Sequence, residues 1–125
     1  MKLNPDCIRD ILLLLEEKIQ YGKVIYINSR NYPTYCYKYS KDELFYHLEQ
    51  WIKFGYISGE YQLYIFKIFD LTPKGHLFLA DIRSETVWNK TKSIASKVGS
   101  ISLDVLKDIA SDIIVKSLLE QRLRL

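Results

Sequence analysis

Apolar residues recur at helical spacing near the beginning of the chain, and charged residues occupy the opposite side. The apolar positions are Ile8, Ile11, Leu12, Leu15 and Ile19. Asn4 is a favourable N-cap, Pro5 fits the first helical position, and Gly22 is a stop signal. The pattern therefore predicts a helix over residues 5–21 that contributes to the core.

The pattern changes after Gly22 to runs of β-branched and aromatic residues. These runs cover residues 24–27 and 35–39, and a polar loop that contains Pro33 separates them. We expect a two-stranded ribbon here. In its second strand, the alternating Tyr35, Tyr37 and Tyr39 would share one face.

Helical spacing returns after Tyr39. Ser40 and Glu43 form a capping box and Gly55 is a stop signal, so we expect a helix over residues 40–54. Its buried side carries Leu44, Leu48, Trp51 and Ile52. Two runs of strand-forming residues follow, over 61–64 and 65–70, and they predict a short hairpin.

The last third of the chain has a helical pattern throughout. Thr72 is a candidate N-cap with Pro73 at the first helical position. We expect helices over residues 73–98, broken near Arg83 and Ser84, and over residues 102–120. The chain is thus predicted to be an α+β protein with mostly helical structure. A domain over residues 1–83 would carry a C-terminal helical extension over residues 84–125 within the same compact unit.

The middle of the chain resembles the winged-helix repressors. Their recognition helix carries a His-Leu pair and ends at a glycine before the wing, as His47, Leu48 and Gly55 would do here. Residues 71–75 (LTPKG) resemble the strand-to-helix junction that follows their wing. The resemblance implies a winged-helix domain. In the repressors a short helix precedes the recognition helix, so either a brief helix lies near residues 28–33 or the motif is degenerate.

Nearly the whole chain also resembles a small uncharacterised family found in bacterial prophages and mobile elements. The resemblance rests on the opening MKLNPDCIRD, on Tyr46-His47-Leu48, on LTPKGH at residues 71–76, and on the Val87-Trp88 pair. Because that family is a domain of unknown function, the resemblance implies a fold and a genomic context but no activity.

Composition narrows the classes of protein that the chain could represent. Its 125 residues suffice for one domain, and its longest apolar run, Ile11 to Leu15, is far shorter than a membrane span. The beginning of the chain has no hydrophobic secretion segment. We therefore expect a cytoplasmic protein without membrane association, in which Cys7 and Cys36 are reduced.

Catalysis finds little support in the residue pattern. Cys7, Cys36, His47 and His76 lie far apart in the sequence, whereas zinc sites use close pairs of ligands. No phosphate loop or nucleophile elbow is present. We therefore expect a protein that is not an enzyme and has no metal, cofactor or small-molecule ligand. His47 is expected at the edge of the core.

Nucleic-acid binding is the more specific hypothesis. Residues 18–41 contain five Lys or Arg and no acidic residue, a composition that favours contact with phosphates. The predicted contacts to double-stranded DNA are Lys23, Arg30, Lys38, Tyr46, Gln50, Lys53 and Lys74, with Gln50 as the base reader. Asp42 and Glu49 share the outward side of the same helix and oppose the approach of phosphates. Two functions therefore stay open: a DNA-binding regulatory accessory factor, and a protein-interaction module on a winged-helix scaffold without DNA binding.

The apolar positions of the last helix are too many for one narrow stripe. We expect Ile109, Ile113 and Leu118 to form a homodimer interface. The alternative is that this helix packs back onto the first helix of its own chain.

Overall fold

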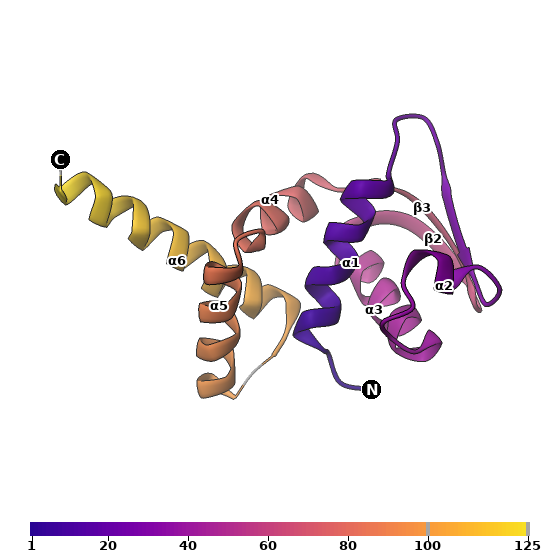
Figure 1. Cartoon of the computed structure of the whole chain (residues 1–125), viewed down its shortest axis with the longest axis horizontal. Coiled ribbons are helices and arrows are strands. Elements are labelled where there is room, and N and C mark those ends of the chain that lie inside the picture. The colour runs from indigo at the N-terminus through magenta and orange to yellow at the C-terminus, as the bar shows by residue number, and fades with distance from the viewer. Residues whose placement is uncertain (100, 125) are drawn as a thin grey trace. The chain divides into compact units, whose positions relative to one another are not determined.

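A computed structural model of the chain describes residues 1–99 and 101–124, and its fold is α+β with helices dominant (Figure 1). The elements are α1 (Pro5–Lys18), β1 (Ile25–Asn28), α2 (Tyr32–Tyr35), α3 (Lys41–Lys53), β2 (Ile57–Gln62), β3 (Ile65–Leu71), α4 (Pro73–Ile82), α5 (Glu85–Val98) and α6 (Leu103–Arg124). The predicted helices are confirmed, including the break near Ser84, with small shifts of their ends. The chain divides into two compact units, Met1–His76 and Leu77–Leu125.

The first unit contains one antiparallel sheet with the strand order β1-β3-β2. In its register, Ile27 pairs with Phe66 and Ile25 pairs with Ile68, and all four side chains are buried. Tyr26 and Lys67 pair on the other face and are exposed. Helices α1 and α3 therefore cover one face of the sheet, whereas the other face is open to solvent (Figure 1).

The core of the first unit is built around α3. Leu48 and Trp51 are 1% and 0% exposed, which confirms their predicted place in the core. The ring of Trp51 meets that of Tyr56 edge to face, with a centroid distance of 5.0 Å. Gly55 ends α3 with a positive φ of 80°, a conformation that glycine adopts without steric cost.

The predicted two-stranded ribbon over residues 24–39 is wrong in its second half. Residues 35–39 form no strand, and a brief helix, α2, lies at Tyr32–Tyr35 instead. Strand β1 pairs with β3, and the Asn31 side chain accepts from the backbone N–H of Asn28 at 2.7 Å and donates to the carbonyl of Tyr26 at 2.8 Å. Asn31 thus uses backbone groups of β1 that a second strand would have needed.

The junction between β3 and α4 follows the sequence prediction. The Thr72 hydroxyl accepts from the backbone N–H of Gly75 at 3.1 Å, as an N-cap does, and donates to the carbonyl of Gly55 at 2.6 Å. A Cβ atom at Gly75 would collide with the carbonyl oxygen of Tyr56. The close approach of these two backbones therefore requires glycine at position 75.

In the second unit, α5 packs against the first half of α6. The buried residues of α5 are Trp88, Thr91 and Ala95, and those of α6 are Leu103, Leu106 and Ala110. Beyond Ala110, α6 has no fully buried residue among those described, and Figure 1 shows that it continues past α5. Within residues 1–99 and 101–124, no helix has the length and hydropathy that a bilayer span needs.

Candidate interaction face of α3 and the β2–β3 hairpin

The solvent-facing side of α3 carries both acidic and polar groups. Asp42 is exposed, and Tyr46, Glu49 and Gln50 are half-buried. Their spacing places them along one side of the helix, opposite Leu44 and Leu48. Lys53 ends this side, and its Nζ lies 3.9 Å from a carboxylate oxygen of Glu49. The face is therefore not basic.

The tip of the β2–β3 hairpin is apolar and strained. Gln62 pairs with Ile65, so the loop consists of Leu63 and Tyr64 alone. Loops of this length favour glycine, asparagine or aspartate, because their residues adopt positive φ. Leu63 instead has a φ of 48° and is 83% exposed, and Tyr64 is 55% exposed. Backbone strain at an exposed apolar tip is a feature of binding surfaces.

A cleft of about 300 Å³ lies between α3 and this hairpin. Its walls are formed by Asp42, Phe45, Tyr46, Glu49, Leu63, Tyr64 and Phe66. The floor is rigid, because the ring of Phe45 packs against those of Tyr64 and Phe66 at centroid distances of 6.0 and 5.1 Å. Two carboxylates therefore stand above an aromatic floor. This combination suits a cationic side chain attached to an apolar segment.

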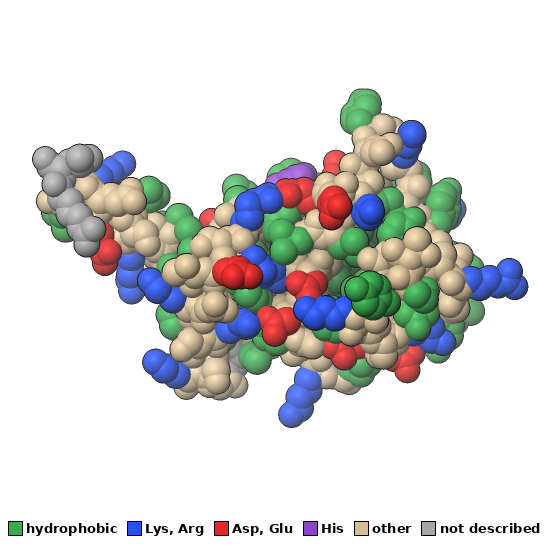
Figure 2. Space-filling view, viewed as in Figure 1, with side chains coloured by type: hydrophobic (Ala, Val, Ile, Leu, Met, Phe, Trp, Pro, Cys, Tyr) green, Lys and Arg blue, Asp and Glu red, His purple; other side chains and the backbone are tan. Residues whose placement is uncertain are grey.

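Basic and acidic side chains are interspersed on the surface that Figure 2 shows, without an extended area of one sign. Residues 1–76 contain ten Lys or Arg and nine Asp or Glu. A duplex-binding face normally gathers several cations along the path of the phosphates. The positions of the predicted DNA-contact residues therefore decide whether such a path of cations exists.

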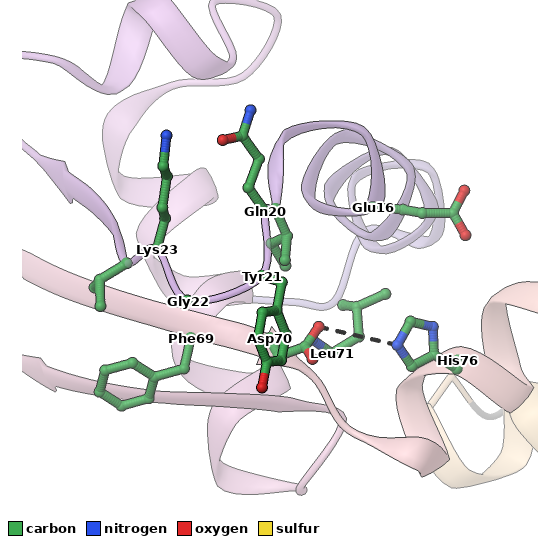
Figure 3. Close-up of a pocket in the computed structure, with 11 residues that line it drawn as sticks. Glu16, Gln20, Tyr21, Gly22, Lys23, Phe69, Asp70, Leu71 and His76 are labelled. Atoms are coloured by element: carbon green, nitrogen blue, oxygen red, sulfur yellow. Dashed lines mark hydrogen bonds and ion pairs between the residues drawn. The ribbon is translucent and has the colours of Figure 1, made fainter.

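Lys23 and Arg30 lie at opposite ends of β1, so roughly 13 Å of strand separates them at 3.3 Å per residue. Arg30 lies at the hairpin end, where it lines a shallow cavity together with Leu63 and Tyr64. Lys23 lines a different cavity, of about 640 Å³, between the end of α1 and the end of β3 (Figure 3). The structure does not bring these two cations together.

The cavity beside Lys23 has polar groups only at its open rim. His76 Nε2 lies 3.9 Å from Asp70 Oδ1, and the two side chains are 55% and 60% exposed (Figure 3). Apolar contact would come from Ile19, Val24, Phe69 and Leu71. Water screens an exposed pair of this kind. This ion pair therefore contributes little to the binding of a ligand.

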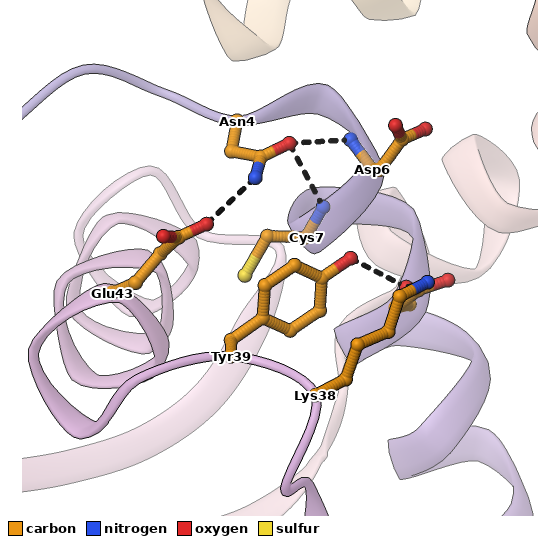
Figure 4. A network of polar contacts seen from close by, with 7 residues as sticks. Asn4, Asp6, Cys7, Lys38, Tyr39 and Glu43 are labelled. Atoms are coloured by element: carbon orange, nitrogen blue, oxygen red, sulfur yellow. Dashed lines mark hydrogen bonds and ion pairs between the residues drawn. The ribbon is translucent and has the colours of Figure 1, made fainter.

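Lys38 is engaged with α1 rather than with solvent alone (Figure 4). Its Nζ lies 3.0 Å from Asp10 Oδ2, which also accepts a hydrogen bond from the Tyr39 hydroxyl at 2.6 Å. The hydrogen bond to Asp10, together with its charge, raises the pKa of Lys38. Burial and the hydrogen bond that Tyr39 itself donates to Asp10 raise the pKa of Tyr39, which keeps its hydroxyl a donor. Lys38 thus joins the loop before α3 to α1.

Lys74 also contacts groups of its own fold. Its Nζ donates to the carbonyl of Phe54, the C-cap of α3, at 3.2 Å, and lies 4.3 Å from the centroid of the Tyr56 ring. A cation at the C-terminal end of a helix is favourable to the helix dipole. Of the seven predicted contact residues, Tyr46, Gln50 and Lys53 lie along one side of α3, and Arg30 lies beside the hairpin tip. Their role in binding stays a prediction.

The two residues most suited to catalysis in α1 and α3 are part of the packing. His47 is 1% exposed, Nε2 accepts from the backbone N–H of Asn4 at 2.8 Å, and Nδ1 lies 2.7 Å from the carbonyl of Glu43. Cys7 is fully buried, and burial raises the pKa of its thiol, which disfavours the reactive thiolate. In the part of the chain that the structure describes, no three potential metal ligands cluster.

The chain matches the family described as "Hypothetical protein (DUF2513)" over residues 2–102. It belongs to the DUF2513 family. The chain is also 33% identical to an uncharacterized protein of Haemophilus influenzae over 126 aligned residues, which span 94% of this chain and 99% of that protein. No solved structure matches the chain.

The DUF2513 match contains the whole first unit and α5, and it ends just before α6. Within that match, the sequence interpretation missed the hairpin tip and Lys41, whose Nζ lies 5.0 Å from the centroid of the Tyr64 ring. The predicted strands over 61–64 and 65–70 placed Leu63 and Tyr64 in the first strand, whereas the structure places them in the turn between β2 and β3. The turn therefore exposes two apolar side chains beside α3.

Proposed function

We propose that residues 1–76 form a winged helix that acts as a non-enzymatic protein-interaction module of phage or mobile-element origin. The element order α1-β1-α2-α3-β2-β3 and the strand order β1-β3-β2 support the winged-helix assignment, with α3 in the place of the recognition helix and the β2–β3 hairpin as the wing. The brief α2 occupies the position of the helix before the recognition helix.

The observation that carries the proposal is the cleft between α3 and the wing. In a DNA-binding winged helix this region would face the duplex, yet here Asp42 and Glu49 line it and would repel phosphates. The same carboxylates attract a lysine or arginine, and Leu63 and Tyr64 provide apolar contact. The partner is therefore a protein segment with a basic residue beside aliphatic or aromatic ones.

A random peptide display library tests this proposal. Panning on the full-length protein is expected to enrich peptides with Arg or Lys next to a large apolar residue. Substituting both carboxylates (Asp42→Lys with Glu49→Lys) should weaken the binding of a labelled enriched peptide at least about tenfold, since each lost charge-assisted contact contributes about 1–3 kcal/mol. The matched control carries the same charge change elsewhere, Glu17→Lys with Glu120→Lys, and should bind as the parent does.

The strained wing tip provides a second variant for the same assay. Leu63→Gly removes the apolar side chain and also relieves the positive φ, so we expect unchanged or slightly higher stability together with weaker peptide binding. Enriched peptides without basic residues, or equal binding by the carboxylate variant and its control, would contradict the proposal.

DNA binding is the second candidate function, and one observation favours it. Arg30 and Lys41 flank Tyr64 at the wing tip, where two cations could contact phosphates on either side of an inserted wing. Lys38 and Lys74 have partners within the fold, so we expect about two phosphate contacts per chain, from Arg30 and Lys41. The logarithm of the binding constant should then fall with the logarithm of the salt concentration with a slope near −2. Anisotropy of a labelled duplex between about 50 and 200 mM salt measures this slope. Arg30→Gln should weaken duplex binding and leave peptide binding unchanged.

A further inference from the structure

We infer that the second half of α6 pairs antiparallel with the same segment of a second copy of this chain. The inference concerns an apolar stripe defined by Ile114, Val115, Leu118 and Leu119. Val115, Leu118 and Leu119 are 50%, 55% and 51% exposed and Ile114 is half-buried, so three neighbouring exposed positions and one half-buried position form an apolar surface on one helix.

The stripe is turned away from the contact that α6 makes with α5. Ala110 is fully buried in the contact with α5. At about 100° per residue, Ile114 and Leu118 point roughly 40° and 80° away from Ala110, and Val115 and Leu119 roughly 140° and 180° away, so the centre of the stripe is turned about 110° from Ala110. The apolar side of α6 therefore changes direction along the helix. The first half of α6 packs against α5, and a partner that covers the second half would have to approach from another side.

The distribution of charge along α6 identifies that partner. The first half of α6 carries Asp104, Asp108 and Asp112 with one cation, Lys107, and so has a net charge of −2. The second half carries Lys116, Arg122 and Arg124 with one acid, Glu120, and so has a net charge of +2. A parallel pair of such helices would place like charges together, and an antiparallel pair places opposite charges together. The helix is therefore the electrostatic complement of its own reversed copy.

The register of the pair follows from the stripe. If Val115 of one copy lies opposite Leu118 of the other, Ile114 faces Leu119 and Arg122 falls opposite Ser111. Asp108 and Asp112 are then within one turn of Arg122 of the partner copy. A two-fold axis repeats each of these contacts, so every substitution acts twice.

The size of the surface sets the strength of the pair. The segment from Ser111 to Arg122 is about 16 Å long at 1.5 Å per residue, which is less than a standard interface requires. We therefore expect a reversible dimer with a dissociation constant on the order of 10 µM. Of the residues predicted from the sequence for this interface, Leu118 lies on the stripe. Ile109 and Ile113 are half-buried and are turned about 100° and 60° from Ala110 in the direction opposite to the stripe.

Sedimentation equilibrium of the full chain from a few to several hundred micromolar tests the inference. The mass should rise from 14.8 kDa toward twice that value. Leu118→Glu with Leu119→Glu should weaken association at least about 100-fold, because the two-fold axis places four carboxylates in the interface. The matched control is Val98→Glu, an equally exposed apolar position at the end of α5, and it should associate as the parent does.

Charge exchange tests the antiparallel arrangement. Arg122→Glu should weaken the dimer about three- to tenfold, and adding Asp112→Lys to it should restore the parent affinity. Circular dichroism melting checks that the variants are folded. A parent chain that stays monomeric throughout, or a stripe variant that dimerises normally, would overturn the inference. Failure of the double exchange to restore affinity would overturn the antiparallel register.

Discussion

The two units of this chain use apolar side chains in different ways. In the first unit, the thirteen residues of α3 bury five side chains, Leu44, Phe45, His47, Leu48 and Trp51, and other elements surround them. In the second unit, the much longer α6 fully buries only Leu103, Leu106 and Ala110 among its described residues. Both helices have abundant apolar residues, but only α3 has them covered within its own unit.

The polar contacts of the two units also differ. In the first unit, Asn4 caps α1 and donates to the Glu43 carboxylate at 2.6 Å, so one side chain joins α1 to α3 (Figure 4). Asp10 similarly binds Lys38 and Tyr39. In the second unit, Thr91 donates to the carbonyl of Val87 and Ser117 donates to that of Ile113, each within one helix, and Ser84 and Ser102 accept from backbone N–H groups of the helices that they cap. Sequence-distant contacts fix the first unit, whereas local contacts stabilise the helices of the second.

The largest expected effect is the loss of the central aromatic residue of the first unit. Trp51→Ala should lower the free energy of unfolding by about 3–5 kcal/mol, because Trp51 is 0% exposed and its removal leaves a large cavity. For a small domain, such a loss can prevent folding. Urea unfolding followed by circular dichroism measures it. A variant that unfolds within a few tenths of a molar of the parent midpoint would show that this core is not essential.

A pair of identical substitutions on α6 sharpens the comparison within one helix. Leu106→Ala should cost about 2–4 kcal/mol, because Leu106 is fully buried against its neighbours. Leu118→Ala should change the stability of the dilute protein by less than about 0.5 kcal/mol, because Leu118 is 55% exposed. Both are measured by urea unfolding at low micromolar concentration. Equal costs for the two substitutions would mean that the second half of α6 is covered by its own chain.

Much of the fold could be predicted because local chemistry determines it. Asn4, Ser40, Thr72 and Ser84 act as the caps that their residue types predict. The tyrosine-rich segment was predicted wrongly because its β propensity is outweighed by contacts distant in sequence. Asn31 occupies the edge of β1, and Tyr39 bonds to Asp10 on α1. The β propensity of a segment does not include contacts with residues that are distant in sequence.

The candidate site was less predictable for a related reason. The sequence shows which residues are cationic but not which groups they contact. Lys38 contacts Asp10, 28 positions away, and Lys74 contacts the carbonyl of Phe54, 20 positions away. The cleft also depends on a register that places Phe66 next to Phe45. The outward side of α3, in contrast, follows from helical periodicity alone and was placed correctly, including Asp42 and Glu49.

The smallest expected effect compares two partly buried aspartates, Asp10 in the first unit and Asp81 on α4 in the second. Asp10 accepts hydrogen bonds from Lys38 and Tyr39, whereas burial raises the pKa of Asp81 above its ordinary value. Desolvation disfavours the ionised form of Asp81, so its carboxylate destabilises the fold at neutral pH. Below the unfolded-state pKa the carboxyl is protonated in both states, and this destabilisation disappears.

Asp81→Asn should therefore raise the melting temperature at pH 7 by about 1–2 °C, since the side chain is only partly buried and water screens its charge. The difference from the parent should shrink as pH falls through the folded-state pKa of Asp81 and vanish near pH 3. Asp10→Asn is the matched comparison and should have the opposite sign at pH 7, because it removes the charge that binds Lys38. Melting curves followed by circular dichroism between about pH 3 and 7 measure both variants. If Asp81→Asn destabilises the protein at pH 7, its carboxylate is held by a contact that favours the charged form, and the contrast between the two aspartates is wrong.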